Sequence, residues 1–206
     1  VGGCIVFFCG MEIAGITNPF NSYISFTPIL SLLVTIFWVV AITNAVNFID
    51  GVDGLAAGVS AIAAFTLMLI AIQRHQAGVV GLAAALGGSA LGFLPYNFNP
   101  AKIFMGDTGS LLLGFILSII AILGPFKTTT AIAIVLPVLV LGLPILDTIL
   151  VILRRIQRGK PIYVADKEHL HHRLLKKGLS QRRVVLILYS VTIIFCLIAL
   201  LLARGS

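Results

Sequence analysis

Residues 29–72 read ILSLLVTIFWVVAITNAVNFIDGVDGLAAGVSAIAAFTLMLIAI. Two almost wholly apolar runs, residues 29–46 and 55–72, flank a short segment that holds Asp50, Asp53 and two glycines. Each run is close to the roughly 20 residues that an α-helix needs to cross about 30 Å of hydrocarbon. The stretch therefore predicts two membrane-spanning helices joined by a polar turn at one membrane surface.

The rest of the chain has the same character. Hydrophobic residues make up 59% of its 206 residues, charged residues make up 10%, and the mean hydropathy is +1.13. Soluble domains are about 25% charged, and a soluble fold of this size could not bury so much apolar surface. We therefore expect an all-α, polytopic integral membrane bundle that forms a single membrane domain over residues 1–206. Seven spans are expected, at residues 1–16, 29–46, 55–72, 77–96, 111–123, 130–153 and 184–203.

The connections between these spans differ in charge. The crossings place residues 50–54, 97–108 and 154–183 on one face, and these connections hold eleven of the fourteen basic residues. The positive-inside rule makes that face cytoplasmic. Four of the five aspartates lie on the same face: Asp50, Asp53, Asp107 and Asp166. The fifth, Asp147, lies within about two helical turns of it.

The stretch NAVNFIDGVDGLAAG, residues 44–58, spaces four polar residues by three: Asn44, Asn47, Asp50 and Asp53. On a regular α-helix, the first and the last of them would point to opposite sides. A 3₁₀ turn, or a break at Gly51 or Gly54, would let the four converge, because glycine makes such a break cheap. The alternative is that one aspartate caps the helix that begins near Leu55, which explains one carboxylate and neither asparagine.

The stretch YNFNPAKIFMGDTGSLLLG, residues 96–114, adds a third acid on the same face. Pro100 ends the preceding helix near Tyr96. Asp107 could cap the next helix or complement its dipole. Alternatively, its carboxylate could ligate a metal, with backbone N–H groups of the Gly-Ser turn facing a phosphate. Beside the two aspartates of the first stretch, the ligand interpretation is favoured.

The stretch ADKEHLHHRLLKKGLSQRR, residues 165–183, clusters His169, His171 and His172 before Arg173. The spacing is not HExxH, which would set two histidines and a glutamate on one zinc-binding helix face. Basic residues on both sides suit an anionic ligand such as a pyrophosphate, and the alternative is a loop attracted to anionic lipid. Asp147, in LPILDT, lies inside an expected span, so its partner must come from another segment.

These residues favour one kind of chemistry. Hard oxygen ligands favour Mg²⁺ or Mn²⁺ over zinc, and carboxylates that share a metal with substrate phosphates are typical of phosphoryl transfer. At a membrane surface, we expect one lipid substrate and one soluble phosphate compound, and no nucleic-acid partner. A metal that bridges a pyrophosphate would let a lipid-borne oxyanion attack it.

The chain resembles the polyprenyl-phosphate N-acetylhexosamine-1-phosphate transferases in four motifs, in this order: NAVNFIDGVDGLAAG, NFNPAKIFMGDTGSLLLGF, LPILDT and HLHHRLLKKG. The resemblance covers nearly the whole chain. HLHHRL is similar to the bacterial branch that makes undecaprenyl-pyrophosphate-GlcNAc for teichoic acid, O-antigen or related glycans. The peptidoglycan branch, which uses UDP-MurNAc-pentapeptide, usually has three consecutive histidines, and Leu170 interrupts them here.

The resemblance implies an activity and a location. It implies transfer of GlcNAc-1-phosphate from UDP-GlcNAc to undecaprenyl phosphate, a polyprenyl phosphate lipid, which gives undecaprenyl-pyrophosphate-GlcNAc and UMP. The implied cofactor is Mg²⁺ (or Mn²⁺). The implied location is the bacterial plasma membrane, with several crossings and an active site that faces the cytoplasm. A homodimer is left open.

The resemblance also implies roles for single residues. Asp107, together with Asp50, matches the metal site, and Asp53 is expected near the uracil. Phe104 matches an aromatic residue that stacks on uracil. Asn97 matches an asparagine of the uridine pocket. The other residues that match substrate-binding positions are Asn44, Asn47 and Arg173. The catalytic candidates are Asp50, Asp53, Asp107, His169, His171 and His172, and nothing in the resemblance says which histidine does which job.

One departure from the family pattern concerns the start of the chain. The family carries an Asp-Asp motif upstream of these motifs, and this sequence has no Asp-Asp pair. We therefore expect the C-terminal portion of a longer enzyme, and no UMP release from this chain alone. The alternative hypotheses are a transferase for another UDP-sugar, an intramembrane aspartyl protease, a transporter and a non-catalytic fragment. FMGDTG only faintly resembles the protease motif, because Phe104 stands where that motif has glycine.

Overall fold

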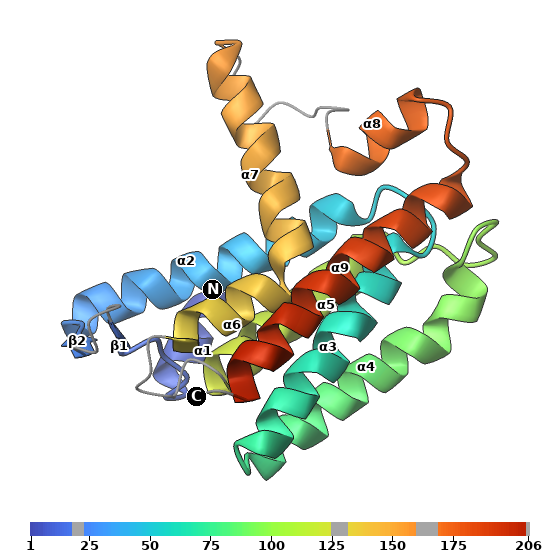
Figure 1. The fold of residues 1–206 in the computed structure, drawn as a ribbon. Helices are drawn as coiled ribbons and strands as arrows, with labels where there is room; N and C mark the ends of the chain where they lie inside the picture. The colour runs from blue at the N-terminus through green and yellow to red at the C-terminus, as the bar shows by residue number, and fades with distance from the viewer. Residues whose placement is uncertain (18–22, 125–131, 160–168, 205–206) are drawn as a thin grey trace.

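Figure 1 shows a computed structural model of the chain, which describes residues 1–17, 23–124, 132–159 and 169–204. In these ranges the helices are α1 (Gly2–Phe8), α2 (Pro28–Ile49), α3 (Leu55–Gln73), α4 (Ala77–Asn97), α5 (Gly106–Leu123), α6 (Ile132–Val140), α7 (Gly142–Gln157), α8 (Leu170–Lys176) and α9 (Gln181–Arg204). Asp166 and three of the basic residues used to orient the chain, Lys127, Lys160 and Lys167, lie outside the described residues.

The described helices confirm an all-α, multi-pass membrane protein. Within the described ranges, α2, α3, α4, α5 and α9 are long and apolar enough to cross a membrane, and α6 with α7 makes a sixth span if the pair is counted together. The ends of α3, α4 and α9 lie within a few residues of their predicted places. Helix α5 starts earlier than predicted, at Gly106, which gives it 18 residues.

The predicted span over residues 1–16 is wrong. Helix α1 covers Gly2–Phe8, so the predicted helix does not continue to residue 16. The chain then turns at Gly10, whose φ of +77° suits glycine. Beyond this turn, β1 (Gly15–Thr17) pairs antiparallel with β2 (Tyr23–Ser25). Glu12 accepts a 2.6 Å hydrogen bond from the Ser31 hydroxyl, which ties the segment to the first turn of α2.

The predicted span over residues 130–153 is broken near its middle. Helix α6 ends at Val140 and α7 begins at Gly142, with a bend of 81° between them. Pro144 has no N–H to donate to the Val140 carbonyl, so the helical hydrogen-bond ladder is interrupted there. A Cβ at Gly142 would lie 2.9 Å from the Phe195 ring of α9. Helix α7 packs against α2 and α9, and its C-terminal end projects from the bundle, as Figure 1 shows.

Helix α3 lies in the middle of the bundle and packs against α4, α5 and α9. Its buried faces are rich in small residues, such as Ala57, Ala61 and Ala64, which let neighbouring helices approach closely. Helices α2 and α5 are also close, because a Cβ at Gly114 would lie 2.8 Å from the Thr43 Cα. This close packing of α2 on α5 brings the polar end of α2 to the start of α5.

Candidate active site

The polar connections meet at one end of the bundle. The turn 50–54, the connection 98–105, helix α8 and the first turn of α9 lie at this end in Figure 1, and hydrogen bonds join the two connections to each other and to α9. The predicted convergence of segments that are distant in sequence is therefore confirmed. The side of the membrane that this end faces stays a prediction from charge.

Asn47 on α2 is bonded to the start of α5. Its Nδ2 donates to Asp107 Oδ1 at 3.1 Å and to Ser110 Oγ at 2.8 Å. Asp107 lies in the first helical turn, where its charge complements the helix dipole, but the N-cap residue is Met105. Because Asp107 is exposed, Asn47 holds the carboxylate without covering it.

Asp50 directly follows α2 and lies near two other carboxylates. Its pKa is raised to about 6, first by burial and then by the negative charges of Asp107 and Asp53. A divalent cation would relieve this repulsion. Among the described residues, no three His, Cys, Asp or Glu side chains are arranged to hold a metal by themselves. This donor set fits Mg²⁺, which one or two carboxylates usually share with water and substrate phosphates.

Asp53 caps a turn in the neighbouring connection. Its Oδ2 accepts hydrogen bonds from Asn99 Nδ2 and from the Ala101 N–H, each at 3.1 Å. The N-cap of α3 is Gly54, which has a φ of +82° and no side-chain capping bond. The alternative that an aspartate caps this helix is therefore wrong, and the carboxylate links two loops.

Two predicted substrate-binding asparagines have partners within the chain. Asn97 is buried, its Oδ1 accepts the Gly54 N–H at 3.1 Å, and its Nδ2 donates to the Ile103 carbonyl at 3.0 Å. Asn44 is exposed and donates to the Val40 carbonyl of its own helix at 2.7 Å. Because α2 stays helical beyond Asn44, the break at the glycines comes too late to bring Asn44 to the aspartates. Substrate contacts of both residues stay predictions.

Phe104 is 77% exposed and lines a cavity of about 290 Å³. The cavity walls also include Phe93, Met105 and Leu112. An exposed aromatic ring three positions before Asp107 offers a flat surface for stacking. The predicted contact of this ring with uracil is compatible with its position and stays a prediction.

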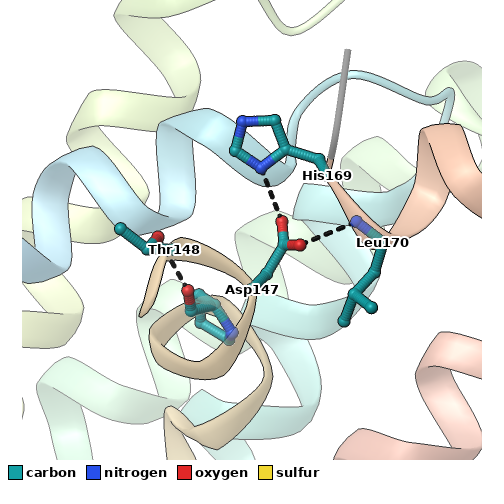
Figure 2. Close-up of polar contacts among 5 residues, drawn as sticks. Asp147, Thr148, His169 and Leu170 are labelled. Carbon is teal, nitrogen blue, oxygen red and sulfur yellow. Dashed lines mark hydrogen bonds and ion pairs between the residues drawn. The ribbon is translucent and has the colours of Figure 1, made fainter. Parts of the chain in front are cut away.

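Asp147 on α7 binds the beginning of the histidine segment, as Figure 2 shows. Its Oδ2 lies 2.8 Å from His169 Nδ1, and its Oδ1 accepts the Leu170 N–H at 2.7 Å. The Asp147 side chain is 2% exposed. The prediction that this acid takes its partner from another segment is confirmed.

The three imidazoles lie together beside the 50–54 turn. The rings of His169 and His171 are nearly parallel, with centroids 5.6 Å apart, and those of His171 and His172 are 4.3 Å apart. His171 is buried against Gly51, where a side chain would overlap its ring. The pKa of His171 is lowered to about 4, first by burial and then by His172. Arg173 is exposed at the same end.

Sequence reasoning missed the residues that fix these loops. The Tyr189 hydroxyl donates to the Gly54 carbonyl, and Arg182 Nε donates to the Asn99 carbonyl at 2.9 Å. The side chains of Gln181 and Asn99 are also hydrogen-bonded. A single tyrosine inside the apolar run 184–203 was a visible signal for the first contact. Nothing in the sequence pointed to the others.

Comparison with known proteins gives both a family and relatives. The family model described as glycosyl transferase family 4 matches residues 1–125. Over 172 residues, the chain is 49% identical to the "Probable undecaprenyl-phosphate N-acetylglucosaminyl 1-phosphate transferase" of Bacillus subtilis (strain 168), which covers 84% of this chain and 48% of that protein.

Two further relatives carry related names. The chain is 43% identical over 186 residues to the "Decaprenyl-phosphate N-acetylglucosaminephosphotransferase" of Mycobacterium leprae (strain TN), with 77% of this chain and 45% of that protein covered. It is 41% identical over 178 residues to the "Phospho-N-acetylmuramoyl-pentapeptide-transferase" of Moorella thermoacetica, with 85% and 52% covered. The chain thus spans about half the length of the curated relatives it matches.

Proposed function

The chain belongs to glycosyl transferase family 4, and we propose that it works in the transfer of GlcNAc-1-phosphate from UDP-GlcNAc to undecaprenyl phosphate. The products are undecaprenyl-pyrophosphate-GlcNAc and UMP. The names of the Bacillus subtilis and Mycobacterium leprae relatives support a polyprenyl phosphate acceptor and an N-acetylglucosaminyl phosphate donor group. The sequence HLHH at residues 169–172 supports the same branch of the family.

The reaction exchanges one phosphoanhydride for another. An oxygen of the lipid phosphate forms a bond to the sugar-bearing phosphorus of UDP-GlcNAc. The bond from this phosphorus to the bridging oxygen breaks, and UMP leaves with the electron pair. Because the attacking group and the phosphorus are both surrounded by negative oxygens, the site must offset charge and hold the two substrates in line.

The residues at this end of the bundle suit these tasks. When bound, Mg²⁺ would neutralise charge on the diphosphate, and Asp107 and Asp50 would hold it. Asn47 keeps the Asp107 carboxylate in place through its 3.1 Å hydrogen bond. Phe104 offers a stacking surface for uracil, and the histidine segment with Arg173 offers donors for phosphate oxygens. The surplus of basic residues supports a cytoplasmic location for the site.

The observation that carries the proposal is the position of Asp50 close to Asp107 and Asp53, at the bundle end that also holds the three imidazoles. An aspartyl protease needs two acids and leaves the imidazoles without a task. A transporter usually places its acids near the bilayer midplane, between paired repeats. Phosphoryl transfer between a lipid and a nucleotide uses all of these groups at the membrane edge.

Activity is best tested in a chimera in which this chain replaces the matching segment of the Bacillus subtilis relative. Membranes that hold the chimera are given labelled UDP-GlcNAc, undecaprenyl phosphate and Mg²⁺, and UMP release and labelled lipid are measured. We expect both products, and we expect EDTA or Asp107→Asn to abolish them. Glu12→Gln, which removes an acid at the other end of α2, is the matched control and keeps activity.

The same assay separates the alternatives. Activity that survives EDTA would contradict metal-assisted transfer and would favour an aspartyl enzyme. Because the Moorella thermoacetica relative is a phospho-N-acetylmuramoyl-pentapeptide-transferase, UDP-MurNAc-pentapeptide is tested as a second donor. We expect UDP-GlcNAc to be preferred, since Leu170 interrupts the run of histidines. The 206-residue chain alone is expected to release no UMP.

A further inference from the structure

The three histidines lie in three different environments, and this difference separates their roles. His171 is 2% exposed and packs against the backbone at Gly51. His172 lies against His171 at a centroid distance of 4.3 Å. The ring of His169 is held by the Asp147 carboxylate. Environments this different suggest that the segment does not present three equivalent groups to a ligand.

The contacts of Asp147 decide the protonation pattern of His169. Both carboxylate oxygens are used, one by His169 Nδ1 at 2.8 Å and the other by the Leu170 N–H at 2.7 Å. An ionised carboxylate only accepts hydrogen bonds, so the proton lies on Nδ1 of the imidazole. Such an arrangement fixes both the tautomer and the direction of the ring. The second ring nitrogen, Nε2, lies on the side away from Asp147 in Figure 2.

Two other rings lie beside that of His169. Phe48 lies on one neighbouring helix with its ring centroid 5.8 Å away, and His171 lies 5.6 Å away and nearly parallel. Phe48 lies in the last turn of α2, the helix that leads into the 50–54 turn. The ring therefore has a hydrogen bond at one edge and two aromatic neighbours.

We propose that Asp147 is a positioning residue, which accepts the Nδ1–H of His169 and directs the opposite edge of the ring to a phosphate oxygen of the substrate, to which Nε2 donates once it also carries a proton. His171 then has a structural task, the packing of the 50–54 turn. The choice of a phosphate-containing ligand rests on the function proposed above. The phosphate can belong to the nucleotide diphosphate or to the lipid, and both present the same anionic oxygens.

The charges around the site agree with this division of tasks. With protons on both ring nitrogens, His169 donates Nδ1–H to Asp147 and Nε2–H to an anionic oxygen in a charge-assisted hydrogen bond. His171 faces the opposite situation, since burial lowers its pKa to about 4 and keeps its ring neutral near pH 7. A buried neutral ring is suited to packing rather than to anion binding.

The test uses the 206-residue chain in lipid nanodiscs with ¹⁵N-labelled histidine. In the ligand-free chain we expect NMR to show His169 as the Nδ1–H tautomer. Titration with UDP and Mg²⁺, with inorganic pyrophosphate, and with undecaprenyl phosphate in the discs is expected to shift the His169 Nε2 resonance and to leave that of His171 nearly unchanged. The arm that gives the shift identifies the source of the phosphate.

Variants connect the tautomer to ligand affinity. Asp147→Asn should mix the two tautomers of His169 and weaken UDP binding about tenfold, as expected for loss of a hydrogen bond to a charged group. His169→Gln should weaken binding to a similar extent, and the double variant should lose no more than either single one. Thr148→Val is the matched control, because the Thr148 hydroxyl donates to the Pro144 carbonyl of its own helix (Figure 2).

Specific results would overturn the inference. An Nε2–H tautomer in the wild-type chain, or a His169 resonance that no phosphate ligand shifts, contradicts it. If Asp147→Asn does not fold, His169→Gln and the wild-type titration decide the question. A chain that binds no UDP but shows the Nδ1–H tautomer and a pyrophosphate shift would refute the proposed donor and support the role of Asp147.

Discussion

The hydroxyl of Tyr189 on α9 donates a hydrogen bond to the carbonyl of Gly54, which lies 135 positions earlier in the chain. The N–H of Gly54 donates to Asn97 Oδ1 at 3.1 Å. Helices α9 and α4 therefore hold Gly54 through both of its backbone polar groups. Because Gly54 follows Asp53 directly, these two bonds help to set the position of the Asp53 carboxylate.

Tyr189→Phe should loosen this turn. The variant removes one of the two hydrogen bonds that the Gly54 carbonyl accepts, since the Gly58 N–H also donates to it at 3.0 Å, and a typical hydrogen bond contributes about 0.5–1.5 kcal/mol net. We expect a lower midpoint of thermal unfolding and, in the chimera, slower UMP release. Tyr23→Phe on the exposed strand β2 is the control. Equal midpoints for Tyr189→Phe and wild type would show that this bond contributes nothing.

Gly51→Ala should disturb the histidine segment. The added methyl group would overlap the ring of His171, which is 2% exposed and has little room to move. Overpacking of this kind costs about 1–3 kcal/mol. We expect reduced thermal stability and weaker binding of UDP-GlcNAc by calorimetry. Gly88→Ala on α4 is the matched control, since its Cβ would meet nothing within 4 Å, and similar losses in both variants would refute the explanation.

Acid should destabilise the fold through His171. The pKa of His171 is about 4 in the folded chain and 6.5 in the unfolded chain. Between these two pH values, the unfolded chain therefore binds more protons than the folded chain. The contribution of His171 is therefore complete above a pH of about 6.5 and is lost as the pH falls toward about 4. His171→Phe removes this contribution. The measurement is the difference in unfolding midpoint between wild type and variant across this range.

Asp50 acts in the opposite direction over an overlapping range. Its pKa is raised from 3.8 to about 6, so acid favours the folded state at this residue. The wild-type curve alone therefore mixes two effects, and the wild-type-minus-variant difference isolates His171. A difference that stays constant between neutral and acidic pH would rule out the proposed protonation behaviour.

Phe104→Ala should affect donor binding and leave stability unchanged. The side chain is 77% exposed, so its removal takes away little packing. Stacking of an aromatic side chain on a base contributes about 1–3 kcal/mol, so we expect the KM for UDP-GlcNAc in the chimera to rise about tenfold or more. The KM for undecaprenyl phosphate should not change. Ile103→Ala, the neighbouring exposed apolar residue, is the control, and an unchanged KM for UDP-GlcNAc in Phe104→Ala would remove Phe104 from the uracil site.

Hydropathy predicted the uninterrupted helices well and the broken segments poorly. Helices α3, α4 and α9 follow from long apolar runs, because backbone groups in lipid must pair within the segment. The same argument failed at residues 1–16 and 130–153. A hydropathy sum does not include the turn that Gly10 allows or the helical hydrogen bond that Pro144 removes, although both residues are visible in the sequence.

The site was predictable as a group of polar segments and not as a set of contacts. Spacing and charge placed Asp50, Asp107 and the histidines at one end of the bundle. The pairing of Asp147 with His169 depends on how α7 leaves the bundle, which no local pattern encodes. Asn97 was expected to bind substrate, but both its amide oxygen and its amide nitrogen are hydrogen-bonded to backbone groups of the chain.

The bend between α6 and α7 has a consequence for how the site senses its surroundings. His169 is bonded to Asp147 on α7, five residues beyond the start of that helix at Gly142, and its ring also lies beside Phe48 of α2. A tilt of α7 about the bend would carry this imidazole along. By reciprocity, a ligand that grips the imidazole would restrain the tilt. A change in the lateral pressure or thickness of the bilayer around α7 would then change the affinity for substrate, without any lipid entering the site.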